Sequence, residues 1–204
     1  MLSDEKLEKL LVRVRACTHC KEHLPLGPRP VLQMHNDARI LIAGQAPGRL
    51  VHASGIPFND PSGRRLRNWM GIDEQTFYDA RKIAILPMGF CYPGSSKSGD
   101  LPPRPECAPL WRDLLLDKLQ NLRLTLVIGA YAQRWHLGTS ASLTARVRDG
   151  LKGIDSDRNA VIALPHPSPR NNRWLKQNEW FEIELVPKLQ AVVRRVLETP
   201  MGSD

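Results

Sequence analysis

The four cysteines of this 204-residue chain have a spacing that would let them do chemistry together. Cys17 and Cys20 are separated by two residues, and Cys91 and Cys107 by fifteen. Two thiolates three positions apart can bind one metal centre from a tight turn, and the second pair would tie the N-terminal segment to the rest of the chain. Four thiolates suit either a tetrahedral zinc ion or an iron–sulfur cluster. Buried thiols that act as small apolar side chains, and disulfide bonds, are the alternatives.

Two loops carry further residues with chemical potential. The first, residues 44–48, reads Gly-Gln-Ala-Pro-Gly, and it lacks the spacing of a phosphate-binding loop. The second, residues 165–171, reads Pro-His-Pro-Ser-Pro-Arg-Asn. Its prolines restrict the backbone, so a rigid loop can present His166 on one side and Arg170 and Asn171 on the other.

Each of these loops follows a short apolar run, and four such runs occur along the chain: residues 39–44, 83–86, 124–129 and 160–164. Each run is continuous rather than alternating, as expected of strands that are covered on both faces. Helical patterns occupy residues 1–16, where Ser3 can cap the helix, and residues 62–70, 109–122 and 178–197. Residues 92–109 form a long proline-rich loop, and a loop of this length in a compact domain is often functional. This order predicts an α/β fold, a parallel sheet with helices on both faces. In that architecture a site forms outside the carboxyl ends of the strands, where the two loops lie.

Length and composition limit the class of protein. A chain of 204 residues with 42% hydrophobic and 25% charged residues is typical of one globular domain, and it excludes a disordered, collagen-like or disulfide-dense chain. We divide it into an N-terminal helix and metal-binding segment (1–38), a core (39–198) and a tail (199–204). The net charge of +8 is compatible with a polyanionic partner. No apolar run is long enough to span a membrane, and no secretory signal precedes the core, so we expect a cytoplasmic protein.

In these loops and cysteines the chain resembles the uracil-DNA glycosylase superfamily, and most of all its thermophile-type iron–sulfur branch. That branch has a Gly-Glu-Ala-Pro-Gly loop followed by Gly-x-Pro-Phe, at the spacing seen between Gly44 and Phe58. Its cluster ligands follow the spacing of the four cysteines, and residues 129–138 resemble its strand-to-helix stretch. Residues 166–171 are closer to the single-strand-selective branch. The resemblance covers about residues 17–175.

The resemblance implies a three-layer α/β/α sandwich around a four-stranded parallel sheet. It implies hydrolysis of the bond between a damaged base, uracil or a related deaminated base, and deoxyribose in DNA, after the nucleotide has been flipped out of the stack. It also implies that Cys17, Cys20, Cys91 and Cys107 hold a structural 4Fe-4S cluster, with zinc as the alternative. We expect a monomer whose partner is DNA and not a membrane.

The implied roles can be assigned residue by residue. His166 would donate to the developing base anion, helped by backbone N–H groups of the first loop. Phe58 would stack on the flipped base, and Arg170 and Asn171 would reach into the vacated stack or hold the adjacent backbone. The remaining residues expected to contact substrate are Gly44, Ala46, Pro47, Gly48, Pro87 and Ser168. Two basic sets, Arg64, Arg65 and Arg67 and then Arg170, Arg173 and Lys176, would bind phosphates or form a solvated basic surface.

Three positions depart from the family pattern. Gln45 replaces the glutamate of the thermophile-type branch, Ala46 replaces a water-activating Asp or Asn of other branches, and Pro87 stands where many branches place an Asn that reads uracil. An amide cannot act as a general base, although it can orient water. We therefore expect Gln45, His166 and Asp60 as the catalytic set, with Asp60 as a substitute base. The alternatives are a glycosylase for another lesion such as hypoxanthine, a weak or inactive DNA-damage binding protein, and a nucleotide-binding or metal-stabilised interaction protein.

Overall fold

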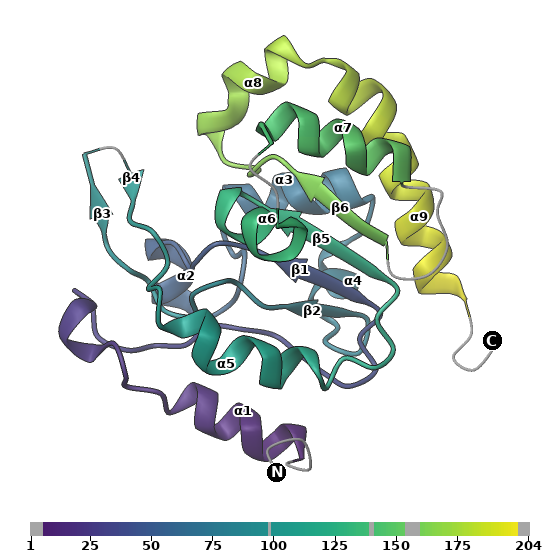
Figure 1. The fold of residues 1–204 in the computed structure, drawn as a ribbon. Coiled ribbons are helices and arrows are strands. Elements are labelled where there is room, and N and C mark those ends of the chain that lie inside the picture. Colours follow the sequence, from purple (N-terminus) through teal and green to yellow (C-terminus); the bar gives the residue numbers. More distant parts are fainter. Residues whose placement is uncertain (1–5, 98, 139–140, 154–159, 200–204) are drawn as a thin grey trace.

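A four-stranded parallel sheet lies at the centre of the computed structural model, which describes residues 6–97, 99–138, 141–153 and 160–199. Its strands are β1 (Ile40–Ala43), β2 (Ile83–Ile85), β5 (Leu124–Ile128) and β6 (Ala160–Leu164). The order across the sheet is β2-β1-β5-β6, and all three pairings are parallel (Figure 1). The predicted strands and the predicted parallel sheet are therefore confirmed, and β1 and β5 occupy its centre.

Helices precede, separate and follow the strands along the chain. They are α1 (Leu7–Arg15), α2 (Arg49–Ser54), α3 (Pro61–Met70), α4 (Glu74–Tyr78), α5 (Cys107–Leu116), α6 (Ala130–Leu137), α7 (Leu143–Gly153), α8 (Asn172–Gln177) and α9 (Val186–Glu198). Short turns of other helix types are η1 (Lys21–His23), η2 (Pro169–Asn171) and η3 (Phe181–Leu185), and β3 (Ser95–Ser96) pairs with β4 (Gly99–Asp100) in a small antiparallel hairpin. Among the described residues no helix is long and apolar enough to cross a bilayer.

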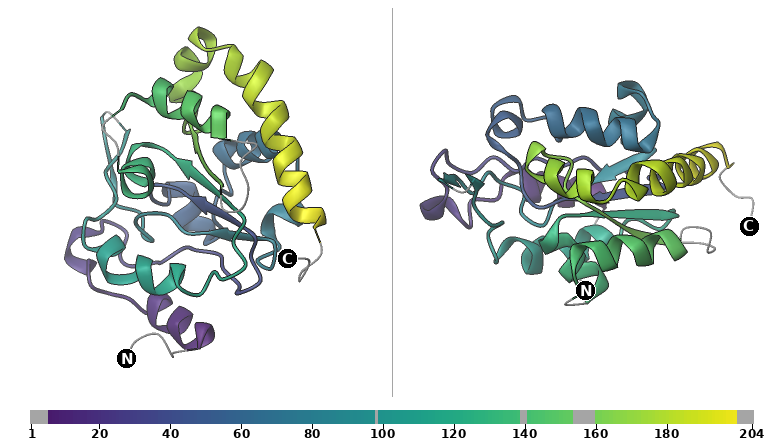
Figure 2. Two further views of the ribbon diagram at one scale, coloured as in Figure 1. Left: turned by 45° about the vertical axis from the view of Figure 1, so that its right-hand side comes forward. Right: turned by 90° about the horizontal axis from the view of Figure 1, so that it is seen from above.

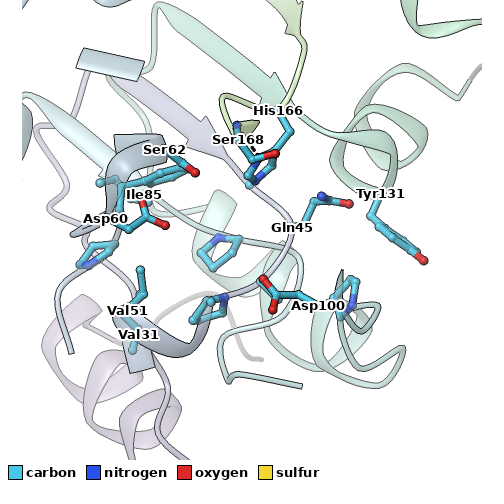
Figure 3. Close-up of a pocket in the computed structure, with 18 of the residues that line it drawn as sticks. Val31, Gln45, Val51, Asp60, Ser62, Ile85, Asp100, Tyr131, His166 and Ser168 are labelled. Atoms are coloured by element: carbon cyan, nitrogen blue, oxygen red, sulfur yellow. Dashed lines mark hydrogen bonds between the residues drawn. The ribbon is translucent and has the colours of Figure 1, made fainter. Parts of the chain in front are cut away.

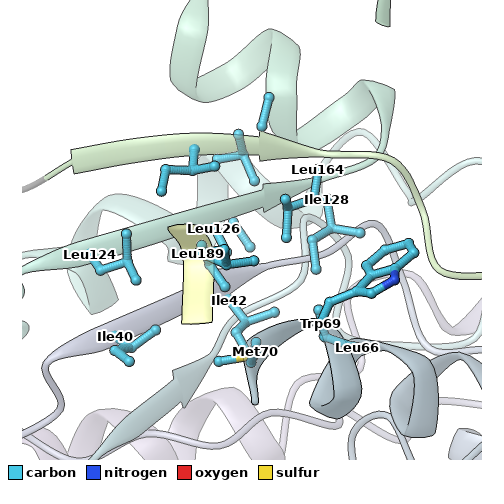
Figure 4. Close-up of a cluster of buried hydrophobic side chains, with 14 of the residues drawn as sticks. Ile40, Ile42, Leu66, Trp69, Met70, Leu124, Leu126, Ile128, Leu164 and Leu189 are labelled. Atoms are coloured by element: carbon cyan, nitrogen blue, oxygen red, sulfur yellow. The ribbon is translucent and has the colours of Figure 1, made fainter. Parts of the chain in front are cut away.

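The helices form two outer layers because successive residues of each strand point to opposite faces. Ile40 and Ile42 belong to a buried cluster with side chains of α3 and α9, and Figure 4 shows Trp69 and Leu189 in it. Leu41 instead packs in a second cluster with side chains of α1 and α5. Seen from above, α3 lies on one side of the sheet and α5, α6 and α7 on the other (Figure 2). The result is the three-layer α/β/α arrangement.

Several local predictions need correction. The helix predicted for residues 178–197 is divided, because Pro187 has no N–H to donate and its ring crowds the preceding turn, and the chain forms the wider turn η3 before α9. The helix predicted from residue 109 begins at Cys107, and residues 92–106 are not wholly irregular, since they contain the β3–β4 hairpin. The predicted cap Ser3 lies outside the described residues.

Candidate functional site

A cavity of about 440 Å³ opens at the carboxyl edge of the sheet. The loop after β1 supplies residues 44–48, the loop after β2 supplies Pro87, α6 after β5 supplies Tyr131, and the loop after β6 supplies residues 166–171 (Figure 3). All four parallel strands thus end at this cavity, as the rule for open parallel sheets predicts. Its volume lies within the usual range for a small-molecule site.

The cavity brings together every residue that the sequence singled out as catalytic or substrate-binding. These residues come from positions far apart in the chain, and they are Gly44, Gln45, Ala46, Pro47, Gly48, Phe58, Asp60, Pro87, His166, Ser168, Arg170 and Asn171. The cavity is also lined by residues that no sequence motif marked, among them Val31, Ser62, Asp100 and Tyr131.

His166 is held in one orientation by its own loop. Its Nδ1 accepts a hydrogen bond from the backbone N–H of Ser168 at 3.3 Å, and the Asn171 side-chain amide donates to the His166 carbonyl at 2.8 Å. Burial lowers the pKa of His166, partly opposed by the carboxylates of Asp60 and Asp100 and reinforced by Arg170. The imidazole is therefore neutral at neutral pH, and because Nδ1 accepts, its proton is on Nε2. Asn171 acts here as a positioning residue for the loop.

Gln45 lies between the ends of β1 and β5. Its backbone carbonyl accepts a hydrogen bond from Gly89 N–H at 2.9 Å, which ties the first loop to the loop after β2. Its side chain packs against Gly129 so closely that a Cβ on Gly129 would come within 2.7 Å of Gln45 Cδ. Gly129 has φ +83, so glycine satisfies both the backbone conformation and the close approach. The packing holds the Gln45 amide at the cavity.

Asp60 and Phe58 belong to one tight turn before α3. An Asp60 carboxylate oxygen accepts from Gly63 N–H at 2.8 Å, which makes Asp60 the N-cap of α3. Phe58 has φ +55, a conformation rare for aromatic residues, and its ring meets Phe77 edge-on at 6.2 Å between centroids. The ring also packs within 3.6 Å of the position that a Cβ on Gly44 would occupy. The turn thus aims an aromatic face along the first loop.

We expect Gly63→Ala to disrupt this turn. A Cβ at Gly63 would lie 1.8 Å from the Phe58 carbonyl oxygen, so the start of α3 or the strained turn must move. Overpacking of this kind typically destabilises a protein by about 1–3 kcal/mol. Urea unfolding should show the loss, while Asn68→Ala at an exposed position of the same helix should change stability by less than about 0.5 kcal/mol. Equal stability of the two variants would contradict the packing described here.

Pro87 is supported from behind by a buried cation. Arg112 is only 1% exposed, and it donates to the carbonyls of Leu86 at 2.9 Å and Pro87 at 3.3 Å. Its other amino group lies 2.6 Å from His136 Nε2, which must accept because the guanidinium has no lone pair to offer. Burial lowers the pKa of Arg112 to about 10, and burial and then Arg112 lower the pKa of His136 to about 4. His136 is therefore a neutral acceptor.

This arrangement predicts a pH dependence of stability. Between about pH 6.5, the pKa of an unperturbed histidine, and about pH 4, the unfolded chain binds a proton at His136 that the folded chain does not. The free energy of unfolding should therefore fall as the pH falls through this window. His136→Gln retains an acceptor and removes the titration, so its urea midpoint should fall less than that of the native protein between about pH 7 and about pH 5. Identical pH slopes would contradict the assignment.

Asp100 reaches the cavity from the β3–β4 hairpin, which lies within the proline-rich stretch of residues 92–109. The guanidinium of Arg170 occupies the space next to Gly99, because a Cβ there would lie 1.6 Å from one of its nitrogens. The hairpin is thus packed against the loop that carries His166. Its only sequence signal was the length of a proline-rich segment, since long loops in compact domains are often functional.

Some of the predicted basic side chains contact other parts of the protein, and others are exposed. Arg65 donates to Asn172 Oδ1 at 2.8 Å and so joins α3 to α8, which confirms that the two predicted basic sets lie near each other. Arg67 is not part of a DNA-facing rim, because its guanidinium stacks over the rings of Phe77 and Tyr78 at 5.4 and 5.8 Å. The exposed members are Arg64, Arg170, Arg173 and Lys176.

The four cysteines line a second, small pocket, to which Gly89 and Phe90 of the loop after β2 also contribute. Cys17 follows α1, Cys20 precedes η1, and Cys107 begins α5. The N-terminal segment reaches Cys91 because it runs beside β2, where Gln33 and Ile85 exchange backbone hydrogen bonds and Val31 N–H donates to Phe90 O. All four are free thiols, so the disulfide alternative is not realised here.

The thiol environment is largely apolar, although His19 and Arg104 also line the pocket and Cys20 Sγ donates to a Glu106 carboxylate oxygen at 3.9 Å. Burial raises the pKa of Cys91 to about 11 and that of Cys107 to about 12, and it also raises the pKa of Cys20. Free thiols here would stay protonated at neutral pH, whereas a bound metal would deprotonate them. Phe90 N–H points at the sulfur of Cys107 at 3.4 Å. In the described ranges no three His, Cys, Asp or Glu side chains form a group that could hold a metal ion.

Comparison with known proteins gives two results. A model of the uracil DNA glycosylase superfamily matches residues 33–190. Among solved structures, the solution NMR structure of a candidate uracil DNA glycosylase from Methanosarcina acetivorans matches with 18% sequence identity and a TM-score of 0.43. That match covers 82% of this chain and 98% of the other. The family match spans both loops of the large cavity.

Proposed function

The chain belongs to the uracil DNA glycosylase superfamily, and on that premise we propose that it hydrolyses the N-glycosidic bond of uracil, or of a related deaminated base, in a nucleotide flipped out of DNA. The observation that carries the proposal is the orientation of His166. With Nδ1 engaged by Ser168, the Nε2–H of a neutral imidazole remains to donate at the cavity.

The chemistry requires a donor at that place. When the bond between C1′ and the base breaks, the sugar gains oxocarbenium character and the base leaves as an anion. A preorganised donor stabilises charge as it develops on a base oxygen, and removal of one such donor typically costs about 10²–10³ in rate. His166 fits this role as a neutral group, since its own loop has already fixed the tautomer.

The rest of the cavity suits a planar base. The Phe58 ring offers a stacking face that accepts any base, so it contributes affinity more than identity. Pro87 stands among the lining residues and has neither a side-chain amide nor an N–H, so the base edge must be read by other groups. Exposed Arg170 lines the cavity, and exposed Arg173 and Lys176 follow it on α8, so these cations are candidates for phosphate contacts.

For the cysteine pocket we propose a 4Fe-4S cluster with a structural role. The donor set fits, since four thiols line one largely apolar pocket and a backbone N–H points at one sulfur. Around a single zinc the four sulfurs would lie about 3.8 Å apart, because each Zn–S bond is about 2.3 Å. In a cluster each thiolate binds its own iron, so the four sulfurs can lie farther apart than around a single zinc ion. Cys17, Cys20, Cys91 and Cys107 would hold it and join α1 to the core.

A substrate panel tests the proposed function. Purified protein is incubated with single- and double-stranded oligonucleotides that contain uracil or hypoxanthine, and with undamaged DNA as the control. We expect alkali-sensitive strand breaks at uracil, which report an abasic site. Release of hypoxanthine alone would assign a different lesion. Tight, salt-sensitive binding of damaged DNA without release of any base would show a damage-binding protein and overturn the proposed hydrolysis.

A further inference from the structure

The proposed hydrolysis lacks an obvious group to activate water in the first loop. Gln45 is an amide and cannot accept a proton in the required range, and Ala46 has no polar side chain. Asp60 lines the cavity, but one of its carboxylate oxygens already caps α3 through Gly63 N–H at 2.8 Å. Proton transfer to Asp60 would therefore weaken the start of the helix that supports the site.

Asp100 is a second carboxylate in the same cavity. It comes from β4 and points into the space that His166 enters from the loop after β6 (Figure 3). Its Oδ2 lies 3.5 Å from the position of a Cβ on Gly48, so the carboxylate lies beside the first loop. It is close enough to His166 to raise the pKa of that imidazole. In the part of the chain that the structure describes, no hydrogen bond or ion pair engages its side chain.

The hairpin holds Asp100 in a defined place. Ser95 lies opposite Asp100 in the antiparallel register, Leu101 N–H donates to Gly94 O at 2.9 Å, and Ser96 Oγ donates to Gly99 O at 3.2 Å. The contact between Gly99 and the Arg170 guanidinium then ties the hairpin to the His166 loop. A carboxylate placed by this packing can act on a substrate bound between the loop after β1 and the loop after β6.

We propose that Asp100 is the general base of the hydrolysis, a role that rests on the proposed glycosylase function. Asp100 accepts a proton from a water molecule as the water oxygen bonds to C1′ of the flipped nucleotide. The bond from C1′ to the base breaks, and its electron pair leaves with the base, whose oxygen accepts a hydrogen bond from His166 Nε2–H. The proton on Asp100 then passes through solvent to the base, so the products are an abasic sugar and the neutral free base.

The test compares two isosteric variants, Asp100→Asn and Asp60→Asn, with the native protein in single-turnover uracil release. Asparagine is as good an N-cap as aspartate, so Asp60→Asn preserves the start of α3. We expect Asp100→Asn to lower the rate by about 10²-fold or more, as loss of general base catalysis does, and Asp60→Asn to lower it less. Ser95→Ala, on the same rung of the hairpin, controls for the integrity of the hairpin, and binding of uracil-containing DNA is measured for every variant.

Chemical rescue separates catalysis from a structural role. Asp100→Ala should regain part of its rate in added formate, because a small carboxylate can occupy the vacated place, and Ser95→Ala should not respond. If the native protein releases uracil and the Asp100→Asn variant is unimpaired, the assignment of Asp100 as general base is overturned and the proposed function stands. A larger loss for Asp60→Asn than for Asp100→Asn would also overturn it. A native protein that releases no base would overturn both proposals.

Discussion

His166→Ala is expected to lower the single-turnover rate of uracil release by about 10²–10³-fold, with little change in affinity for uracil-containing DNA. The imidazole lines the cavity and is half-buried and neutral, and its Nδ1 accepts a hydrogen bond from Ser168 N–H. Its remaining donor acts only as charge develops on the departing base, so the loss belongs to the chemical step. Rapid-quench measurement of abasic product, beside a binding titration at the same salt concentration, separates the two quantities.

His166→Asn is the matched control. Its amide retains a donor, so a rate between those of the native protein and His166→Ala is expected. The loop itself should survive both changes, because the Asn171 amide bonds the backbone carbonyl at position 166 rather than the ring. An unaltered rate in His166→Ala, in a preparation that releases uracil, would remove this residue from the mechanism.

Cys107→Ser is expected to remove the visible colour of the purified protein and to lower its thermal midpoint strongly. Metal binding is coupled to folding, and apparent binding free energies of structural zinc sites are about 10–16 kcal/mol, so loss of a ligand can cost a large part of the stability of a domain. Cys107 is the first residue of α5, and its sulfur accepts from the N–H of Phe90 in the loop after β2. The metal centre would join α5 to this loop. Iron, sulfide and zinc contents are measured with the thermal midpoint.

Cys107→Ala distinguishes a ligand from a buried thiol. If the four cysteines only fill apolar space, alanine should be tolerated better than serine, because it buries no hydroxyl group. If they bind a metal centre, both variants should lose metal and stability together. If the native protein is colourless and contains zinc, the centre is a zinc site and not a cluster. If the native protein contains no metal and the variants keep its stability, no metal centre exists.

The sheet and its loops could be predicted because they depend on local patterns. Each of the four strands is a short apolar run that is buried on both faces, except at the start of β6, and such runs are visible without any tertiary knowledge. Parallel strands place their following loops at one edge, so the meeting of Gln45 and His166 followed from the fold class. The cysteine spacing likewise predicted that the two distant pairs meet, and all four cysteines line one pocket, whereas the metal centre there stays a prediction.

Other features were decided by tertiary packing alone. The role of Asp60 as a cap depends on where α3 begins, and the burial of Arg67 depends on Phe77 and Tyr78, which reach it only in the folded chain. The sequence showed residues 92–106 as a proline-rich loop, since a two-residue pairing has no periodicity to detect. Its path across the cavity is set by contacts with a loop some seventy residues away, between Gly99 and Arg170. The sequence by itself thus determined the sheet, its edge and the residues there, whereas the carboxylate that faces His166 was decided by long-range packing, which no local pattern encodes.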